Sequence, residues 1–271
     1  MIYVRPPAVA GMFYPAQPDT LRKDIHTYLD AATPPTLAHV RAIIAPHAGY
    51  VYSGGVAGFA YKILAAQATP PKRIYLLGPS HRVPFRGVAL SEYTAFKTPL
   101  GDFPLDTAQI ERLAEFSTLF TRASEPHAPE HCLEVQIPFL QIVCPATLLV
   151  PMLFGNVNPH TVGQLLSEVL EPDDLIVISS DLSHYHENKT AHQLDHQFLD
   201  ALLAGDETGV LNGEACGQAP AAALLVVAKT HGWQPHLLDY RTSGDVTGDM
   251  GRGVVGYGAV AYTAPITETA D

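Results

Sequence analysis

The sequence predicts an α/β fold in which one mostly parallel or mixed sheet is covered by helices on both faces. Three observations support this fold class. Strand-like and helix-like segments alternate along the 271 residues. The strand-like segments are nearly continuous runs of Ile, Val and Leu, which is typical of strands buried on both faces. No repeat, linker or charge block divides the chain, so we expect a single domain over residues 1–271.

The expected strands are short apolar runs that stop at proline, glycine or polar residues. Pro46 cannot donate to a ladder and biases Ala45 towards extended geometry, so the first central strand ends just before His47. The second strand, Arg73–Leu77, is followed by Gly-Pro-Ser-His ending at His81. Further strands are expected at residues 87–90, 148–152 (stopped by its proline), 174–180, 235–240 and 254–262, with an extended segment at 93–102.

The expected helices lie between these strands. Pro18 opens the first helix, and Leu21, Ile25 and Leu29 follow at helical spacing. Helices are expected at residues 18–30, 56–66, 106–116, 160–170, 189–203 and 216–230, with another that begins near residue 131. The segment 242–253 is dense in Gly and Asp and is expected to be a loop.

Composition excludes several classes of function. Hydrophobic residues make up 47% of the chain and charged residues 16%, which describes a compact globular protein. The net charge of -11, without a basic run, argues against nucleic acid and anionic membranes as partners. Cys132, Cys144 and Cys216 form no CxxC pair and indicate free thiols. Without a signal peptide or a membrane-spanning segment in the sequence, we expect a cytoplasmic protein.

Polar side chains at five strand or loop ends could converge on one site. They are His47, His81, His131 with Glu134, Asp181 with His184, and Asp245 with Asp249. In α/β sheets, ligands bind beyond the carboxyl ends of the strands. Two histidines and one carboxylate with open positions form the ligand set of Fe(II) sites that activate oxygen, but zinc hydrolases use similar sets. The pattern therefore predicts a metal site without naming the metal.

Each of these residues also has a purely structural interpretation. A lone histidine after a strand is often bonded to backbone, but the repeated context at His81 favours a shared site. His131 and Glu134 are three residues apart and face the same side of a helix, either in the site or on a solvated face. Asp181 and His184 follow a fully apolar strand, which favours a functional role.

Other candidates are weaker. His192 and His196 are four residues apart, a spacing that metal pairs use, but the glutamate of the metalloprotease pattern is absent and a solvated face is favoured. Cys216 begins a helix and is either an activated thiol or a small buried residue. The chain has neither a Gly-x-Ser-x-Gly elbow nor a dinucleotide-binding fingerprint, so neither a serine hydrolase nor a dinucleotide-dependent enzyme is expected.

Several long motifs resemble the Memo family. They are Ala45-Pro46-His47-Ala48-Gly49-Tyr50, Gly78-Pro79-Ser80-His81, Glu130-His131-Cys132-Leu133-Glu134, Ser179-Ser180-Asp181-Leu182-Ser183-His184 and the start at residues 6–15. The resemblance extends essentially from end to end. Bacterial and archaeal members are known as AmmeMemoRadiSam system protein B, which implies a functional association with a radical-SAM protein.

This resemblance implies a fold and a metal site. The Memo family is similar to class III extradiol ring-cleaving dioxygenases, which form a three-layer α/β/α sandwich around a mixed sheet. Those enzymes hold non-haem Fe(II) with two histidines and one glutamate. By this resemblance His47 and His81 are the metal-binding histidines. His184 matches an acid/base position, and His131 is a similar candidate.

The third metal ligand is where the sequence departs from the family. The eukaryotic Memo protein uses a cysteine in the loop before the last strand, whereas the loop at 242–249 has none here. Asp245 would restore a set of two histidines and one carboxylate, and Asp249 is the alternative. A carboxylate in this position favours Fe(II) over a copper–thiolate site.

The expected function is therefore that of a metal-dependent, dioxygenase-like oxidoreductase using Fe(II), with zinc or copper as alternatives. A substrate hydroxyl would chelate the metal, and His184 or His131 would transfer a proton, with Asp181 and Glu134 in the same catalytic group. A zinc hydrolase with the same site remains open. So does a non-catalytic module that binds a small molecule, a peptide or a metal in the cleft.

Overall fold

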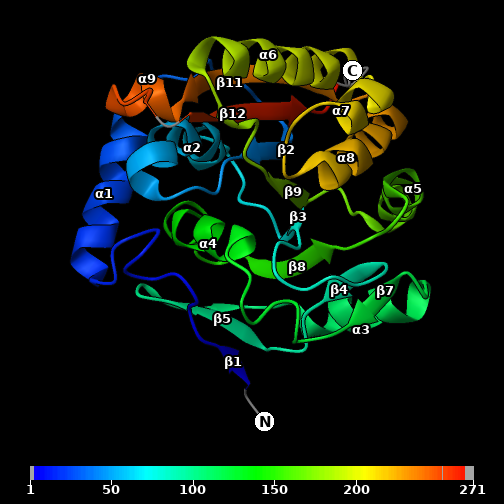
Figure 1. Ribbon diagram of the computed structural model, residues 1–271. Coiled ribbons are helices and arrows are strands. Elements are labelled where there is room, and N and C mark those ends of the chain that lie inside the picture. The colour runs from blue at the N-terminus through cyan, green and yellow to red at the C-terminus, as the bar shows by residue number, and fades with distance from the viewer. Residues whose placement is uncertain (1–2, 252, 266–271) are drawn as a thin grey trace, which may run out of the picture.

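The computed structural model describes residues 3–251 and 253–265 as an α/β/α sandwich (Figure 1). Its main sheet contains β2 (Val40–Ala45), β3 (Arg73–Pro79), β4 (Val88–Leu90), β7 (Phe120–Arg122), β8 (Leu148–Phe154), β9 (Asp174–Ser179), β10 (His184–His186), β11 (Gln234–Thr242) and β12 (Val254–Thr263). The order is β10-β12-β2-β9-β3-β8-β4-β7, and β11 pairs with β12. A small sheet holds β1 (Val4–Arg5), β5 (Ala95–Thr98) and β6 (Gly101–Pro104).

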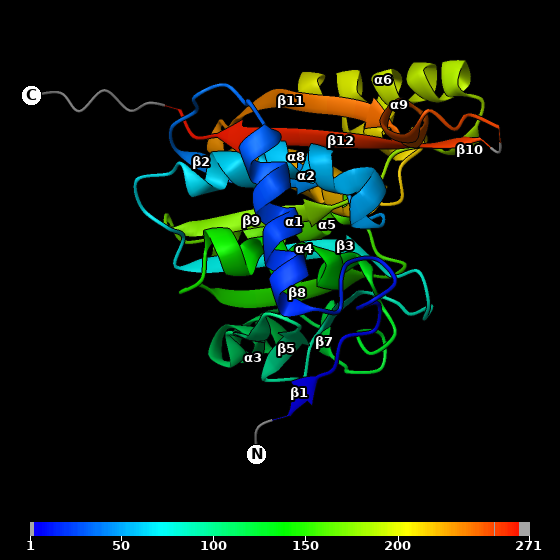
Figure 2. The ribbon, with the colours of Figure 1, turned by 90° about the vertical axis from the view of Figure 1, so that its left-hand side faces the viewer.

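Helices cover both faces of the main sheet. Figure 2 shows α1 (Pro18–Ala31), α2 (Tyr50–Ala65) and α4 (Cys132–Val143) in front of the strands. The opposite face carries α5 (Pro159–Val169) and α8 (Gln218–His231), and α6 (Asn188–Ala204) packs on β11 and β12. The remaining helices are α3 (Thr107–Phe116), α7 (Glu207–Asn212) and α9 (Ser243–Thr247). None of the helices in the described part of the chain is long and apolar enough to cross a membrane.

Four central strands run parallel and place their carboxyl ends along one edge. β2 pairs with β9, β9 with β3, and β3 with β8, all in parallel. At this edge Ala45 lies opposite Ser179. Chain segments that leave parallel strands at one edge are brought together in space. The residues after β2, β3 and β9 therefore face one another, as the sequence predicts.

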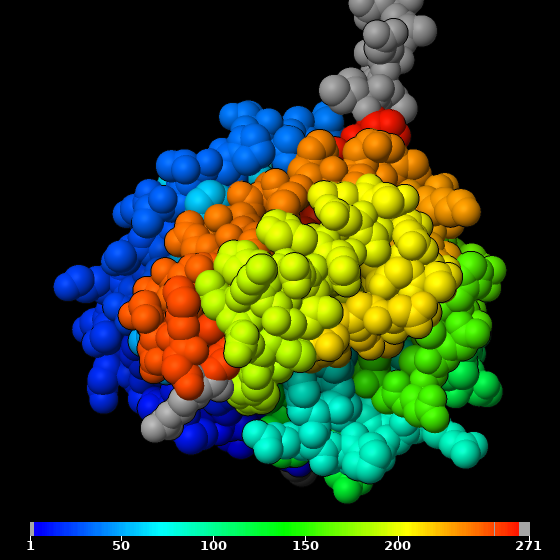
Figure 3. All heavy atoms as spheres, turned by 45° about the horizontal axis from the view of Figure 1, so that its top comes forward, coloured from blue at the N-terminus to red at the C-terminus, as the bar shows by residue number. Residues whose placement is uncertain are grey.

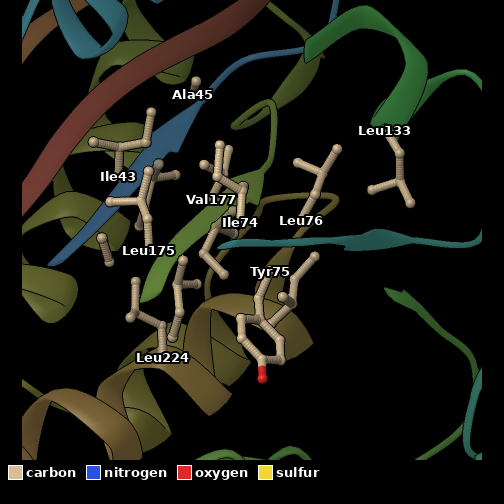
Figure 4. Packing of buried hydrophobic residues seen from close by; sticks show 14 of the residues in the cluster. Ile43, Ala45, Ile74, Tyr75, Leu76, Leu133, Leu175, Val177 and Leu224 are labelled. Atoms are coloured by element: carbon tan, nitrogen blue, oxygen red, sulfur yellow. The ribbon is translucent and has the colours of Figure 1, made fainter. Parts of the chain in front are cut away.

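The central strands are held by apolar side chains on both faces. Ile43, Leu76 and Val177 come from three adjacent strands and are fully buried. Figure 4 shows these side chains within one cluster, with Leu224 of α8 nearby. Burial of each such side chain stabilises the fold by roughly 2 kcal/mol. This packing gives the loops at the carboxyl edge a rigid base.

Two predicted boundaries are wrong for local reasons. The helix expected at residue 56 begins at Tyr50, so Gly54 lies inside the helix rather than before it. The missing side chain of Gly54 lets α2 approach α1, since a Cβ at this position would lie 2.6 Å from the ring of Tyr28. The strand expected to stop at Pro151 continues to Phe154. β4 pairs with β8 only from Met152 onward, so the proline faces a side where no ladder partner is required.

Five short elements are missing from the prediction. The expected loop at 242–253 contains α9, residues 207–212 form α7, and residues 4–5, 120–122 and 184–186 form β1, β7 and β10. Each has only two to six residues. Elements of this length show too little periodicity to be recognised.

Candidate metal centre

Three histidines bring their rings together at the carboxyl edge of the sheet. His47 follows β2, His81 follows β3, and His131 is the N-cap of α4. One ring nitrogen from each lies within 4.8 Å of the other two. The ring centroids are 5.3 Å apart for His47 and His81, 5.4 Å for His47 and His131, and 4.9 Å for His81 and His131. The three side chains are therefore placed so that they could hold one metal ion.

A single buried carboxylate orients two of these rings. Glu130 Oε1 lies 2.9 Å from Nδ1 of His81 and 3.1 Å from Nδ1 of His131. The same side chain accepts the backbone N–H groups of His81, His131 and Cys132. An ionised carboxylate only accepts hydrogen bonds, so Nδ1 of His81 donates to Glu130, and Nε2 is the ring nitrogen left to face a metal. Nδ1 of His131 is in contact with the same oxygen but forms no hydrogen bond of good geometry.

The charge of Glu130 is stabilised by these contacts. Burial raises the pKa of its carboxyl, but the hydrogen bonds from His131 and His81 outweigh burial and hold this pKa well below its usual range. The carboxylate is therefore ionised throughout the physiological range. A carboxylate on the outer nitrogen of a histidine is the arrangement that fixes ring orientation and tautomer in many metal sites.

The tautomer of His47 is set by a different group. Its Nδ1 lies 2.9 Å from Ser179 Oγ. That hydroxyl donates its own proton to Cys132 O at 2.7 Å and accepts Gln136 Nε2 at 2.8 Å. Since the Ser179 proton is used, His47 must donate from Nδ1, and the lone pair of its Nε2 meets Cys216 Sγ at 3.2 Å. Nε2 is thus the ligand atom that both His47 and His81 present.

The electrostatic environment keeps His47 neutral. Burial lowers its pKa to about 4, despite the opposing effect of the nearby Asp181 carboxylate. A neutral imidazole is the form that ligates metals. The donor set and its outer hydrogen bonds therefore fit a divalent metal ion that prefers nitrogen ligands, such as Fe(II), zinc or copper.

A second possible group fits a metal less well. His81, Glu130 and Cys132 also have ligand atoms within 4.8 Å of one another. However, Cys132 is fully buried, its Sγ donates to Pro79 O, and burial raises the pKa of the thiol well above its usual value. A protonated thiol is a poor ligand, because metals bind the thiolate.

The three histidines open into a cavity of about 630 Å³. His184 of β10 and Asp181, which follows β9, also line it. Asp181 Oδ1 accepts the backbone N–H of His47 at 2.7 Å and that of Ala48 at 3.3 Å. The structure therefore brings four of the predicted site residues together with His131, and Asp181 also anchors the loop that carries His47.

Glu134 lies outside this cavity. Its carboxylate is fully buried and forms an ion pair with Arg5 at 2.7 Å. It also accepts the Tyr14 hydroxyl at 2.6 Å and the backbone N–H groups of Ala8 and Val9. The predicted shared face with His131 is therefore not formed, because Glu134 holds the N-terminal segment against α4.

Asp245 is not brought to His47 and His81. It occupies the third position of α9, where it forms a reciprocal capping box with Thr242, and its Oδ2 lies 3.2 Å from His192 Nε2. It is not among the described residues that line the cavity, whereas Asp249 is. His192, expected on a solvated face, is half-buried beside the ring of Tyr240.

Three residues of the site were not assigned from the sequence. Glu130 and Ser179 belong to the recognised motifs, but the contacts that give them a role join distant segments. Cys216 was left open between an activated and a buried thiol. Its Sγ lies 3.2 Å from His47 Nε2, and burial raises its pKa, so the buried thiol is the better description.

The comparison with known proteins decides the family. A family model described as Memo-like protein matches residues 5–261. The chain belongs to the Memo family. A MEMO1 family protein of Methanopyrus kandleri is 36% identical, covering 95% of this chain and 98% of its own. One from Methanothermobacter thermautotrophicus is 33% identical, covering 94% of this chain and 98% of its own.

A solved structure supports the fold of this Memo-family chain. An uncharacterised protein from Escherichia coli K12 superposes with a TM-score of 0.53 over 81% of this chain and 99% of its own. The sequence identity is 14%, so this likeness concerns the fold alone. The mixed sheet with helices on both faces, expected from the sequence and the family resemblance, is confirmed.

Proposed function

We propose that this Memo-family protein binds a divalent metal ion through Nε2 of His47, His81 and His131 and acts as an Fe(II)-dependent oxidoreductase. The observation that carries the proposal is the convergence of three imidazole rings at one wall of an open cavity, with a ring nitrogen of each within 4.8 Å of the other two. Three protein ligands on one side leave positions for a substrate and for a small second ligand such as oxygen. The substrate is a small molecule with oxygen atoms able to chelate the ion.

The remaining residues of the cavity have roles that follow from their position. Fe(II), when bound, supplies a Lewis acid and an electron donor. His184 lines the same cavity and can accept the proton of a chelating hydroxyl and return it later, as imidazole does near neutral pH. Asp181 holds the backbone of His47 and thereby fixes where the imidazole stands. Glu130 keeps His81 in the tautomer that can bind through Nε2.

A zinc hydrolase is the second candidate. It is favoured by the ligand set, which consists of three imidazoles rather than two imidazoles and a carboxylate. Three histidines and a water form the catalytic zinc site of some hydrating enzymes, where the metal lowers the pKa of the bound water to about 7. In this version His184 would move protons to and from the attacked substrate, and no oxygen would be consumed.

Elemental analysis of protein purified without oxygen tests both candidates. We expect stoichiometric metal that is lost from the His47→Ala, His81→Ala and His131→Ala variants. A matched control is His160→Ala, since His160 pairs with Glu207 on the surface. Iron would be followed by oxygen-uptake assays with chelating phenols, and zinc by anaerobic hydrolysis assays. Metal retained in all three cavity variants would refute the centre, and a metal-free wild type would favour a binding module.

A further inference from the structure

The mouth of the metal cavity is unusually apolar for a solvent-exposed surface. Eleven large apolar side chains are exposed among the described residues, and three of these also line the cavity. We call these three the apolar rim: Met12, Tyr52 and Tyr185. Exposed apolar surface gathered in one place marks a binding site.

The rim is assembled from segments that are distant in sequence. It combines the N-terminal segment, the first turn of α2 and β10. Figure 3 shows α9 in orange and the N-terminal part of the chain in blue on the same face, and both contribute to the cavity lining. The exposed apolar residues around this opening therefore come from three separate segments of the chain.

Tyr185 gives independent support. Its backbone has φ of 63°, an uncommon and strained conformation for a residue other than glycine, and its side chain is 79% exposed. Gly253 lies against it, because a Cβ at that position would be 2.5 Å from Tyr185 O. An exposed ring does not repay this strain through packing. Strain retained at a cavity wall indicates a role in binding.

We infer that the ligand of this centre is an amphipathic small molecule with a chelating oxygen head and an apolar arm that lies across the apolar rim. This inference rests on the proposed metal site. The occupant must enter the cavity, because three rim residues line its walls, and this favours a small molecule over a flat protein surface. The head would chelate the ion held by the three histidines, and the arm would cover Met12 and Tyr185.

Two hydroxamates on the zinc-loaded protein test the inference. Acetohydroxamate and octanohydroxamate share the chelating head and differ only in the alkyl chain. We expect octanohydroxamate to bind at least about tenfold more tightly, since burying about two methylene groups gives this factor. The ratio of the two dissociation constants should fall towards unity in Met12→Ala and Tyr185→Ala. It should be unchanged in Phe116→Ala, whose exposed aromatic ring belongs to α3.

The outcomes separate the rim from the metal site. Failure of the protein to retain zinc, seen by metal analysis before any hydroxamate is added, would overturn the metal centre and the inference with it. Retained zinc with equal affinities for the two hydroxamates would overturn the inference alone. A chain-length effect that survives both rim variants would do the same. So would sedimentation showing a dimer that Tyr185→Ala dissociates, because the rim would then cover a second copy.

Discussion

Glu130 and His81 are joined twice: Oε2 accepts the backbone N–H of His81 at 2.6 Å, and Oε1 lies 2.9 Å from its Nδ1. The loop and the ring are thus fixed by one carboxylate, which also reaches His131. Because Glu130 precedes α4 and His81 follows β3, this contact ties two distant segments into one metal-binding surface. Glu130 therefore helps to fix the relative positions of His81 and His131 without being one of the three candidate ligands.

Replacing Glu130 by glutamine should weaken metal binding without removing a ligand. An amide has only one acceptor oxygen, so it cannot accept both the backbone N–H and the ring Nδ1–H of His81 as the two carboxylate oxygens do, and the tautomer of His81 is no longer fixed. We expect zinc affinity to fall by roughly 10- to 100-fold, the usual effect of losing such an outer partner. Competition against a chromophoric chelator measures it. Glu214→Gln is the control, since Glu214 pairs with His186 at the surface; equal affinities in both variants would contradict the role.

The Asp245→Ala variant distinguishes the two possible ligand sets. In the structure this carboxylate caps α9, so its loss should cost on the order of 1 kcal/mol of stability. The metal content should remain that of the wild type. Urea unfolding and elemental analysis of the same preparation measure both quantities. Loss of metal from a folded variant would instead show that Asp245 is a ligand, as expected from the sequence.

The Glu134→Gln variant should destabilise the fold and spare the metal site. Glu134 and Arg5 form a fully buried ion pair, and removing one charge leaves the other buried without its partner. Such changes cost about 3–5 kcal/mol. Urea unfolding should show this loss, while zinc affinity of the folded fraction stays unchanged. A variant with wild-type stability but reduced zinc affinity would show that Glu134 takes part in metal binding. For comparison, Glu171→Gln in the exposed pair with Lys72 should have little effect.

The metal-free protein should lose stability as the pH falls below about 6.5. Burial lowers the pKa of His127 to about 3 and that of His47 to about 4, whereas both titrate near 6.5 when unfolded. Between these values the unfolded state binds more protons, so acid favours unfolding. Each histidine contributes roughly 1.4 kcal/mol per pH unit across its window.

Urea midpoints of the metal-free protein at several pH values between 4.5 and 7.5 check this expectation. His127→Gln should show a shallower dependence, because its side chain does not titrate while its amide can still donate to Ala89 O, as His127 Nε2 does at 3.0 Å. A slope identical to that of the wild type would show that His127 is accessible to protons in the folded state. The histidine would then not be the cause of the acid sensitivity.

The sequence predicted those parts of the site that depend on the parallel sheet. His47, His81 and Asp181 each follow a buried apolar strand, and such strand ends meet at one edge whatever the loops do. Their convergence could therefore be inferred from the chain alone. His184 follows the same logic, because it lies only a few residues beyond β9.

The other parts depend on contacts that no local pattern encodes. Glu134 was grouped with His131 by helical spacing, but the buried charge of Arg5 determines where it points. Asp245 has the right chemistry for a ligand, yet the capping of α9 turns it towards His192. A buried arginine and the N–H groups of a helix terminus can each be the partner of a carboxylate, just as a metal ion can. Composition and spacing cannot distinguish these partners.

The hydrogen bonds behind His47 have a direction as well as a geometry. Tyr61 donates to Gln136 Oε1 at 2.7 Å, which leaves the Gln136 amide nitrogen to donate to Ser179. If Ser179 instead donated its proton to Nδ1 of His47, the proton of the imidazole would lie on Nε2. Three histidines placed in another scaffold would keep their positions but lose this control of the tautomer of His47. Such a design has to carry Ser179 and Gln136 along with the histidine, and Tyr61 of α2 to hold the Gln136 amide in its orientation.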